Sequence, residues 1–283
     1  MRKFAPTEAP ILEVRNLSFS YDGHISALHR VSLSISSGER LAVLGANGAG
    51  KSTFFLCLTG VLRPTQGEIF LQGKPVQKQK ELCRSVGMVF QQADDQIIAS
   101  TVAQEISFGP MNLRLPKQEV IERVERSLDY MELQSFRRRP PHDLSGGEKK
   151  RVTIADILAM NSEIILLDEP AASLDPQGTK HLEAVLTRLS DEGRTLVIAT
   201  HDMDFAFRWA TRVIVFHQGG ILADDLPEKV FQDDDVLQTA KLRQPVLLEI
   251  SNILREKKLL PNTISCPRSV SMLREILQKN LAE

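Results

Sequence analysis

The stretch that most constrains this chain is Gly45 to Thr53, which reads G-A-N-G-A-G-K-S-T and fits the phosphate-loop pattern G-x-x-x-x-G-K-[ST]. An apolar run of strand character, residues 40–44, precedes it, and residues 54–59 can continue as a helix. The glycines allow successive backbone N–H groups to point inward and form an anion-binding nest at a helix N-terminus. The sequence therefore predicts a nucleotide-binding site.

Two side chains of this stretch suit a nucleoside triphosphate. Lys51 would add a positive charge on the β- and γ-phosphates, and the hydroxyl of Ser52 is placed to ligate Mg²⁺. We therefore expect ATP and Mg²⁺ as ligands, whereas a chance glycine turn would bind neither. The residues predicted to contact the nucleotide are Gly45, Ala46, Asn47, Gly48, Ala49, Gly50, Lys51, Ser52 and Thr53.

Composition limits the other classes of function. The chain has 283 residues, 42% hydrophobic and 25% charged, which is ordinary for one large globular domain or one domain with an appendage. The formal net charge of -1 argues against a general nucleic-acid binder. Cys57, Cys83 and Cys266 match no metal spacing and are predicted to be free thiols.

No apolar run approaches the roughly 18 residues of a membrane span, and residues 1–10, predicted to be a loose leader, lack the apolar core of a signal peptide. If the protein acts at a membrane, another chain must therefore supply the crossing.

Polar residues follow two apolar runs of central-strand type. Residues 164–167 end in Asp168 and Glu169, and residues 195–199 are followed closely by His201. The carboxyl ends of parallel strands are where ligands bind in open α/β sheets. Asp168 would hold Mg²⁺ and Glu169 would polarise the water that attacks the γ-phosphate. His201 could hydrogen-bond the γ-phosphate, although a lone histidine is more often structural.

A second glycine-bearing loop, Ser145-Gly146-Gly147-Glu148, opens a predicted helix and could also cradle an anion. Two such sites for one nucleotide make sense if the second serves the nucleotide of a neighbouring copy. Before it, residues 97–116 are expected to form a loop with a short helix, and residues 117–133 have the spacing of an amphipathic helix. These segments predict a small helical subdomain inserted into the core.

Three features keep two interpretations at this stage. Tyr21, at the end of the first predicted strand, could stack on an adenine ring or be an ordinary surface or core residue. Gln91, at the end of the strand at residues 86–90, could reach a metal ion or the attacking water, or cap a loop. The basic residues 137–139 precede a double proline and favour a solvated loop over a nucleic-acid contact.

A composition shift at residues 233–235 marks a predicted boundary. Residues 245–260 and roughly 271–281 are predicted to be helices, and this tail can pack on its own core or meet another copy. The second alternative is slightly favoured, because the preceding part already looks complete. The apolar side of the first tail helix is expected to contain Val246, Leu247, Ile250, Ile253 and Leu254.

With the phosphate loop, L-S-G-G-E at 144–148 and I-I-L-L-D-E-P at 164–170, the chain resembles the ATP-binding cassette (ABC) family over about residues 11–226. The L-S-G-G-E element separates that family from other phosphate-loop ATPases. The resemblance implies an α/β fold with an ABC-type core sheet, an antiparallel β subdomain and a helical insertion. The expected segments are an ATPase domain at 11–232, its helical subdomain at about 92–160 and a helical extension at 233–283.

The resemblance also assigns roles. Tyr21 becomes the adenine-stacking aromatic, Gln91 a Mg²⁺ ligand in the loop that senses the membrane partner, and His201 the switch histidine. Together with Lys51, Glu169 and His201 form the expected catalytic set. The family forms head-to-tail dimers that sandwich two ATP molecules. The other copy would be met by the signature, Ser145, Gly146, Gly147 and Glu148, and by the dimer-contact loop, Ser173, Leu174 and Asp175.

The runs at residues 90–96 and 108–110 look like those of ATPases in energy-coupling-factor importers. Such importers take up vitamins or transition metals through a transmembrane coupling protein and a substrate-binding membrane subunit. The L-R-Q-P run at residues 242–245 is similar to the cobalt/nickel branch. The chain departs from the family's pattern at Ala93, where a proline is common, and at residues 171–172, where a threonine often stands, and neither departure touches the chemistry.

The resemblance implies a peripheral ATPase at the cytoplasmic face of the membrane, with a second copy or a paralogue as partner, powering uptake of cobalt or nickel and binding no nucleic acid. The alternatives are a vitamin-uptake module, an exporter's ATPase, and a soluble cassette protein acting on DNA or ribosomes. The last class needs a coiled-coil insertion or two tandem cassettes, and the sequence has one phosphate loop, one L-S-G-G-E and no heptad array.

Overall fold

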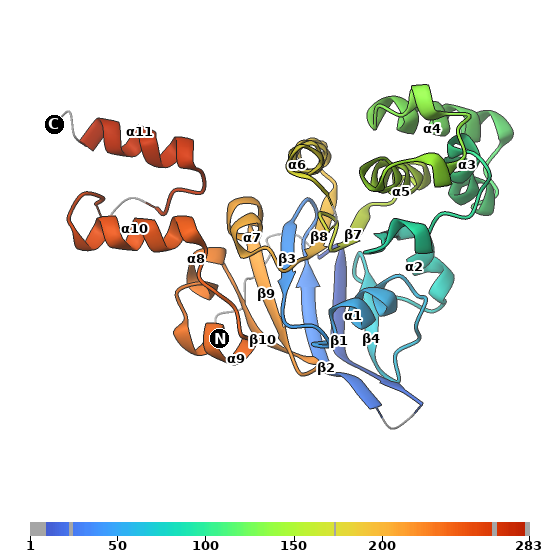
Figure 1. Cartoon of the computed structure of the whole chain (residues 1–283). Helices are drawn as coiled ribbons and strands as arrows, with labels where there is room; N and C mark the ends of the chain where they lie inside the picture. The colour runs from blue at the N-terminus through green and yellow to red at the C-terminus, as the bar shows by residue number, and fades with distance from the viewer. Residues whose placement is uncertain (1–9, 23–24, 173, 262–264, 281–283) are drawn as a thin grey trace. The chain divides into compact units, whose positions relative to one another are not determined.

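The computed structural model describes residues 10–22, 25–172, 174–261 and 265–280. The chain divides into two compact units. Figure 1 labels their helices and strands. The first comprises the residues up to Glu39 together with Ser52–Ala199, and the second comprises Arg40–Lys51 together with the residues from Thr200 onward.

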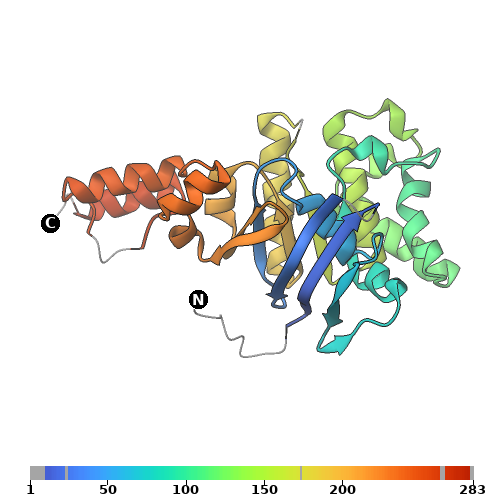
Figure 2. The same ribbon diagram turned by 90° about the horizontal axis from the view of Figure 1, so that it is seen from below.

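An antiparallel sheet of the first unit has the strand order β2-β1-β4-β5. Its two long strands, β1 (Leu12–Tyr21) and β2 (Ile25–Ile35), lie side by side in Figure 2. β4 spans Gln66–Leu71 and β5 spans Lys74–Pro75. The sequence predicted only the second half of β2. Its first half extends the strand because it pairs with the far end of β1, a feature that no local pattern encodes.

Three parallel strands form the buried centre of the first unit: β6 (Val86–Val89), β7 (Ile164–Asp168) and β8 (Thr195–Ala199). Every residue of the three strands is buried, which explains why they appear in the sequence as continuous apolar runs rather than alternating ones. The last residue of β7, at its carboxyl end, is Asp168, as the sequence predicts.

Helices complete the first unit. The expected helical subdomain contains α3 (Val102–Asn112), α4 (Lys117–Tyr130) and α5 (Gly146–Met160), which pack against one another. The other helices longer than one turn are α1 (Lys51–Leu58), which continues from the second unit, α2 (Gln79–Ser85) and α6 (Pro176–Asp191).

Residues 97–116 differ from the expected loop with a short helix, because α3 has 11 residues. Thr101 starts it, since its hydroxyl accepts a hydrogen bond from the backbone N–H of Gln104. Pro110 lies in the last turn, where a proline removes one backbone hydrogen bond, and the burial of Ile106 offsets that loss.

In the second unit, β3 (Arg40–Leu44) is parallel to β9 (Arg212–His217), and β10 (Gly220–Asp225) pairs antiparallel with β9. The predicted closing hairpin is therefore confirmed. α7 (Met203–Trp209) follows directly on residues 200–202.

The C-terminal part contains α8 (Pro227–Val230), α9 (Asp234–Ala240), α10 (Val246–Glu256) and α11 (Val270–Asn280). The acidic residues at 233–235 open α9, because the Asp233 carboxylate accepts the N–H of Val236.

The two predicted tail helices are present as α10 and α11. Fewer residues of α10 are buried than the predicted apolar stripe contains. Of this helix, only Leu248 and Ser251 are buried. Val246, Ile250 and Ile253 are 50%, 41% and 49% exposed. An apolar stripe of α10 therefore faces away from its own core.

Two other sequence expectations can be compared with the described residues. In these ranges no helix combines the length and hydrophobicity that a membrane crossing requires. Cys57, Cys83 and Cys266 are free thiols, as predicted, and burial raises the pKa of Cys57 to about 12.

Candidate nucleotide site

The phosphate loop leaves β3 with a backbone that demands glycine. Gly45 has φ of 142°, and a side chain there would overlap the carbonyl oxygen of Phe216 on β9. Gly48 has φ of 77° and Gly50 of 106°, which bend the loop back toward the start of α1. This backbone agrees with the anion-binding nest that the sequence predicts.

Lys51 supports this loop from within. Its ammonium donates hydrogen bonds to the carbonyl oxygens of Gly45 (2.6 Å) and Ala46 (3.2 Å), and the residue is only 7% exposed. A buried cation is tolerated when its donors are used. The loop therefore carries its own positive charge at the N-terminal end of α1, where an anion is also favoured by the helix dipole.

In the first unit, the next residue of α1 contacts the end of β7. The Ser52 hydroxyl donates a hydrogen bond of 2.6 Å to Oδ2 of Asp168, which is 6% exposed. Residues separated by 116 positions are thus brought within one hydrogen bond. A hydroxyl and a carboxylate are hard oxygen donors of the kind that Mg²⁺ prefers, so the donor set fits that ion.

Glu169 follows Asp168 with an unusual backbone. Its φ is 45°, in the left-handed region that non-glycine residues seldom adopt, and the turn is held because its N–H donates to the carbonyl oxygen of Ala199 (2.9 Å). Such strain clusters at functional sites. The residue is half-buried, and its Oε1 atom is shielded from solvent.

His201 lies in the second unit, one residue before α7. Its side chain is exposed, and the neighbouring residues are fixed: the N–H of Thr200 donates to Val43 on β3 (3.2 Å), and Asp202 caps α7. The imidazole is therefore displayed at the end of a well-anchored segment.

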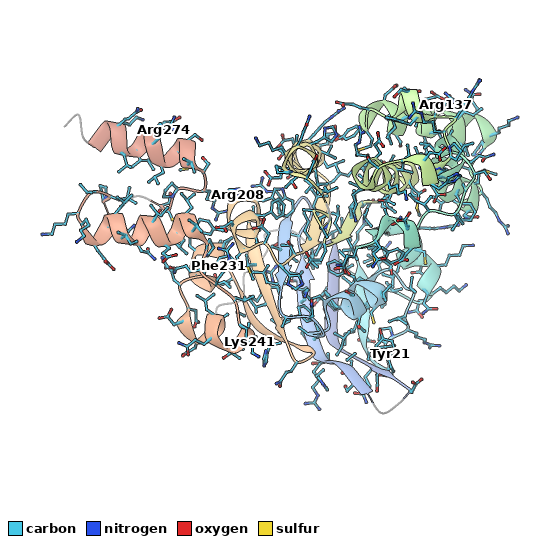
Figure 3. All side chains as sticks on the ribbon, in the orientation of Figure 1. Tyr21, Arg137, Arg208, Phe231, Lys241 and Arg274 are labelled. Carbon is cyan, nitrogen blue, oxygen red and sulfur yellow. The ribbon has the colours of Figure 1, made fainter. Side chains whose placement is uncertain are left out.

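Tyr21 lies beside the last residue of the phosphate loop. Its hydroxyl is 3.2 Å from Oγ1 of Thr53, and its ring, labelled in Figure 3, is 40% exposed and packs edge-on against Phe19. Of the two interpretations left open by the sequence, this position agrees with an aromatic available for stacking on a base.

The second glycine loop forms a complete capping box at the start of α5. The N–H of Ser145 donates to the carboxylate of Glu148 (2.7 Å), and the N–H of Glu148 donates to the Ser145 hydroxyl (3.3 Å). The backbone hydrogen bond from Ser145 holds the pKa of Glu148 below its usual value. No atom lies within 4 Å of the position that a side chain at Gly146 would occupy, so this helix end is open.

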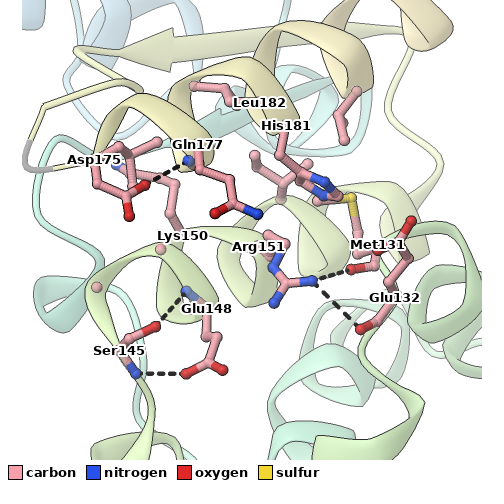
Figure 4. A pocket seen from close by; sticks show the side chains of 16 residues that line it. Met131, Glu132, Ser145, Glu148, Lys150, Arg151, Asp175, Gln177, His181 and Leu182 are labelled. Carbon is pink, nitrogen blue, oxygen red and sulfur yellow. Dashed lines mark hydrogen bonds between the residues drawn. The ribbon is translucent and has the colours of Figure 1, made fainter.

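Figure 4 shows the pocket beside this helix end, which is bordered by α5 and by the start of α6. Leu174 and Asp175 border it, and Asp175 caps α6 by accepting the N–H of Gly178 (2.6 Å). Two of the three predicted dimer-loop residues thus line the same pocket as Ser145–Gly147, and Ser173 lies outside the described residues.

The side chain of Gln91 is exposed, and in the described part of the chain no hydrogen bond joins it to Ser52 or Asp168. Its carbonyl oxygen instead accepts a hydrogen bond of 2.9 Å from Lys150 of α5. Burial lowers the pKa of Lys150 to about 8, and the charge of Asp168 acts in the opposite direction.

Lys150 is a buried residue of α5 to which the sequence motifs assign no role. A signal was available, because Lys150, Ile154 and Ile157 are spaced i, i+4 and i+7 on the buried face of α5. However, a lysine next to another lysine in a basic run is ordinarily expected to be exposed, so the burial of Lys150 was not predicted.

Comparison with known proteins identifies the family of the chain. The family model described as ABC transporter matches residues 28–172. An energy-coupling factor transporter ATP-binding protein, EcfA, of Methanocaldococcus jannaschii is 44% identical over 255 residues, which cover 89% of this chain and 91% of that protein. EcfA2 of Methanospirillum hungatei is 41% identical over 276 residues, covering 96% of this chain and 69% of that protein.

Two solved structures are similar as well. The structure of cbiO1 from Clostridium perfringens, part of the ABC transporter complex cbiONQ, has 36% identity and a TM-score of 0.73, over 87% of this chain and 100% of that one. A dimeric ATP-binding cassette in a post-hydrolysis state, bound to ADP and Pi, has 30% identity and a TM-score of 0.68, over 76% of this chain and 98% of that one. The chain therefore belongs to the ABC transporter family, as an ATP-hydrolysing subunit of the energy-coupling-factor type.

Proposed function

We propose that this chain is the motor of an importer: two ATPase chains close on ATP, hydrolysis reopens them, and a membrane partner uses the movement to take up cobalt or nickel. The observation that carries the catalytic part is the 2.6 Å hydrogen bond between Ser52 and Asp168, which joins the phosphate loop to the acidic end of β7.

In this proposal Ser52 and Asp168 would hold Mg²⁺, with Gln91 as a further ligand. The ion supplies neutralisation of the charge on the β- and γ-phosphates. Lys51 and the loop N–H groups bind the same phosphates, and Tyr21 stacks on the adenine. Catalysis is then mostly positioning and charge neutralisation.

Glu169 orients and polarises the attacking water, and His201 donates a hydrogen bond to the γ-phosphate. The strained backbone at Glu169 supports the first role, because such strain clusters at functional sites. The exposed but anchored position of His201 supports the second.

The nucleotide-binding site is completed by a second ATPase chain, which is either a copy of this chain or a paralogue. The open N-terminus of α5, Ser145–Gly147, binds the nucleotide of the partner, and residues 173–175 contact it. We assign residues 11–232 to the ATPase domain and 233–283 to an extension that contributes to dimerisation. The exposed stripe of Val246, Ile250 and Ile253 supports this assignment.

The membrane partner is proposed to dock on the helical subdomain. Ile98, Phe108 and Met111 are 68%, 48% and 62% exposed, and they follow the loop that contains Gln91. Phe108 and Met111 are three residues apart on α3 and therefore share one face of the helix, and exposed apolar side chains that share a face favour an interaction surface. A transmembrane coupling protein bound there, together with a substrate-binding membrane subunit, would hold this chain peripherally at the cytoplasmic face.

The proposed metal cargo rests on the resemblance of the L-R-Q-P run at residues 242–245 to the cobalt/nickel branch. The similar structure of cbiO1 is described as part of the ABC transporter complex cbiONQ. The run itself is anchored within its own unit, because Arg243 forms an ion pair with Asp204 (2.5 Å) and Gln244 donates to the carbonyl oxygen of Phe231 (2.9 Å).

Purification from host membranes in mild detergent, followed by mass spectrometry and metal analysis, tests the proposal. Recovery of a helical coupling protein and a metal-binding membrane subunit would support it. A related cassette chain with vitamin-binding proteins would move the chain to a shared vitamin-uptake module. Ribosomes or DNA alone would overturn the transport function.

A further inference from the structure

Lys150 connects two parts of the first unit that the proposed mechanism uses separately. It lies in the second turn of α5, the helix whose N-terminus is the signature, and is 4% exposed. Its ammonium donates hydrogen bonds to the carbonyl oxygens of Phe90 (2.8 Å) and Gln91 (2.9 Å). These are the two residues that follow β6 and begin the loop proposed to sense the membrane partner.

The two carbonyl oxygens lie beyond the end of the strand ladder formed by β6 and β7, which ends at Val89. Carbonyl groups in such a position need another donor when they are shielded from water. A single ammonium satisfies both, and its charge strengthens each bond. Successive peptide groups of the loop are therefore fixed to one point on α5.

A neighbouring contact provides the contrast. Lys149 also joins α5 to the same loop, through an ion pair of 2.6 Å with Asp94, but the Asp94 side chain is 75% exposed. Exposed ion pairs contribute little because solvent competes for both charges. The two connections therefore differ in exposure: Lys150 is 4% exposed and binds backbone oxygens, whereas the side chain of Lys149 is 17% exposed and its partner is an exposed carboxylate.

We propose that Lys150 is a positioning residue that makes the Gln91 loop and the signature helix move as one body. A displacement of the loop by the membrane partner would then be transmitted through the ammonium to α5, and from there to Ser145–Gly147. This inference rests on the proposed function, because it gives the loop and the signature the roles assigned above. It adds a residue that neither role includes.

A merely structural lysine would make a different prediction. If Lys150 only stabilised the fold, its loss would lower the melting temperature and leave the catalytic constants of the folded protein unchanged. If it positions the loop and the signature, its loss must lower kcat in protein that is still folded. The KM for ATP should change little, because the phosphate loop does not involve Lys150.

The test uses the full-length chain with three variants. Lys150→Met keeps the length of the side chain and removes the donors, Lys150→Arg keeps the charge and the donors, and Lys149→Gln is the matched control at the exposed contact. Steady-state ATP hydrolysis gives kcat and KM, and thermal unfolding shows the folded fraction.

We expect Lys150→Met to lower kcat by about 10- to 100-fold, the loss that a misplaced group causes, with KM for ATP nearly unchanged. Lys150→Arg should restore most of kcat, and Lys149→Gln should change it less than about threefold. Folded Lys150→Met with the wild-type kcat would overturn the proposal, and so would a control that loses as much activity as Lys150→Met.

If Lys150→Met does not fold, Lys150→Gln takes its place, because its amide can donate to one carbonyl. A partial loss of kcat is then expected, and a wild-type kcat would again overturn the proposal. Measuring Glu169→Gln in parallel separates a failure of the proposed catalytic site from a failure of the role proposed for Lys150. Normal turnover in Glu169→Gln would refute the proposed site, whereas an inactive Glu169→Gln beside a fully active Lys150→Met would refute only the role of Lys150.

Discussion

The N-termini of α1 and α5 both follow a glycine-bearing loop, but the polar groups of the two loops are satisfied in different ways. Before α1, Lys51 turns back and binds the carbonyl oxygens of Gly45 and Ala46. Before α5, Ser145 and Glu148 cap the helix reciprocally. One of the two lysines of α5, Lys150, donates to the backbone of another loop.

The difference supports unequal roles for the two anion sites that we propose. The α1 loop contains its own cation, and Ser52, the next residue of the chain, donates to Asp168, so the proposed nucleotide site has both a cation and hard oxygen donors. The α5 end is already satisfied by its capping box and offers an open face at Gly146. Such an end can receive a phosphate without depending on it for folding.

The largest expected effect tests whether the α1 loop retains ATP independently of the chemistry. We expect Glu169→Gln to lower kcat about 1,000-fold, as for the loss of a general base, while the Kd for ATP is nearly unchanged. Single-turnover hydrolysis and equilibrium binding of a fluorescent ATP analogue measure the two quantities. Normal turnover in this variant would remove Glu169 from the mechanism.

The next effect concerns the cation of the α1 loop. Lys51→Ala should weaken ATP binding about 100-fold, because charged hydrogen bonds worth about 3 kcal/mol are lost. Isothermal titration with ATP checks this value. An unchanged affinity for ATP would mean that the α1 loop binds the nucleotide without its lysine. The presence of a cation would then not distinguish this loop from the N-terminus of α5.

A smaller effect is expected at the open end of α5. Gly146→Ala places a methyl group where no atom lies within 4 Å, so the melting temperature and the Kd for ATP should stay at the wild-type values. The kcat should fall about tenfold, because the methyl group obstructs the approach of a phosphate from the other chain. Full activity of this variant would contradict the proposal that the N-terminus of α5 binds a phosphate of the partner's nucleotide.

The smallest effect concerns the capping box itself. Glu148→Ala should lower the free energy of unfolding by about 0.5–1 kcal/mol. The pKa of Glu148 is lowered below 4.5 in the folded chain, so the part due to its charge is present above about pH 4.5 and is lost as the pH falls through the lowered value.

Urea unfolding at pH 7 and at pH 3 measures this dependence. Glu148→Gln serves as the control, because glutamine can still close the box but does not titrate. The difference between wild type and Glu148→Gln should therefore shrink at pH 3. An equal difference at both pH values would mean that the carboxylate charge does not stabilise the cap.

Local motifs made much of the site predictable from the sequence. The phosphate loop carries its own conformational requirements, and the apolar run before Asp168 placed that residue at a strand end, which is where the structure has it. The cap of α5 could be anticipated too, since Ser145 and Glu148 have the spacing of a capping box.

Features that depend on distant partners were not predictable. The first half of β2 is a strand only because it pairs with β1, and α3 runs through Pro110 because its apolar side is buried. The burial of Lys150 likewise depends on a loop 59 residues earlier in the chain. The apolar stripe of α10 was recognised, but the sequence could not specify which side would be covered.

The backbone of Glu169 has a consequence for how this chain can change. A non-glycine residue at φ of 45° costs about 1 kcal/mol relative to one that tolerates the left-handed region. Glycine or asparagine at this position would relieve the cost and remove the proposed general base. Selection of a mutant library for thermal stability alone should therefore enrich inactive proteins at position 169, whereas selection for growth should retain the strained glutamate.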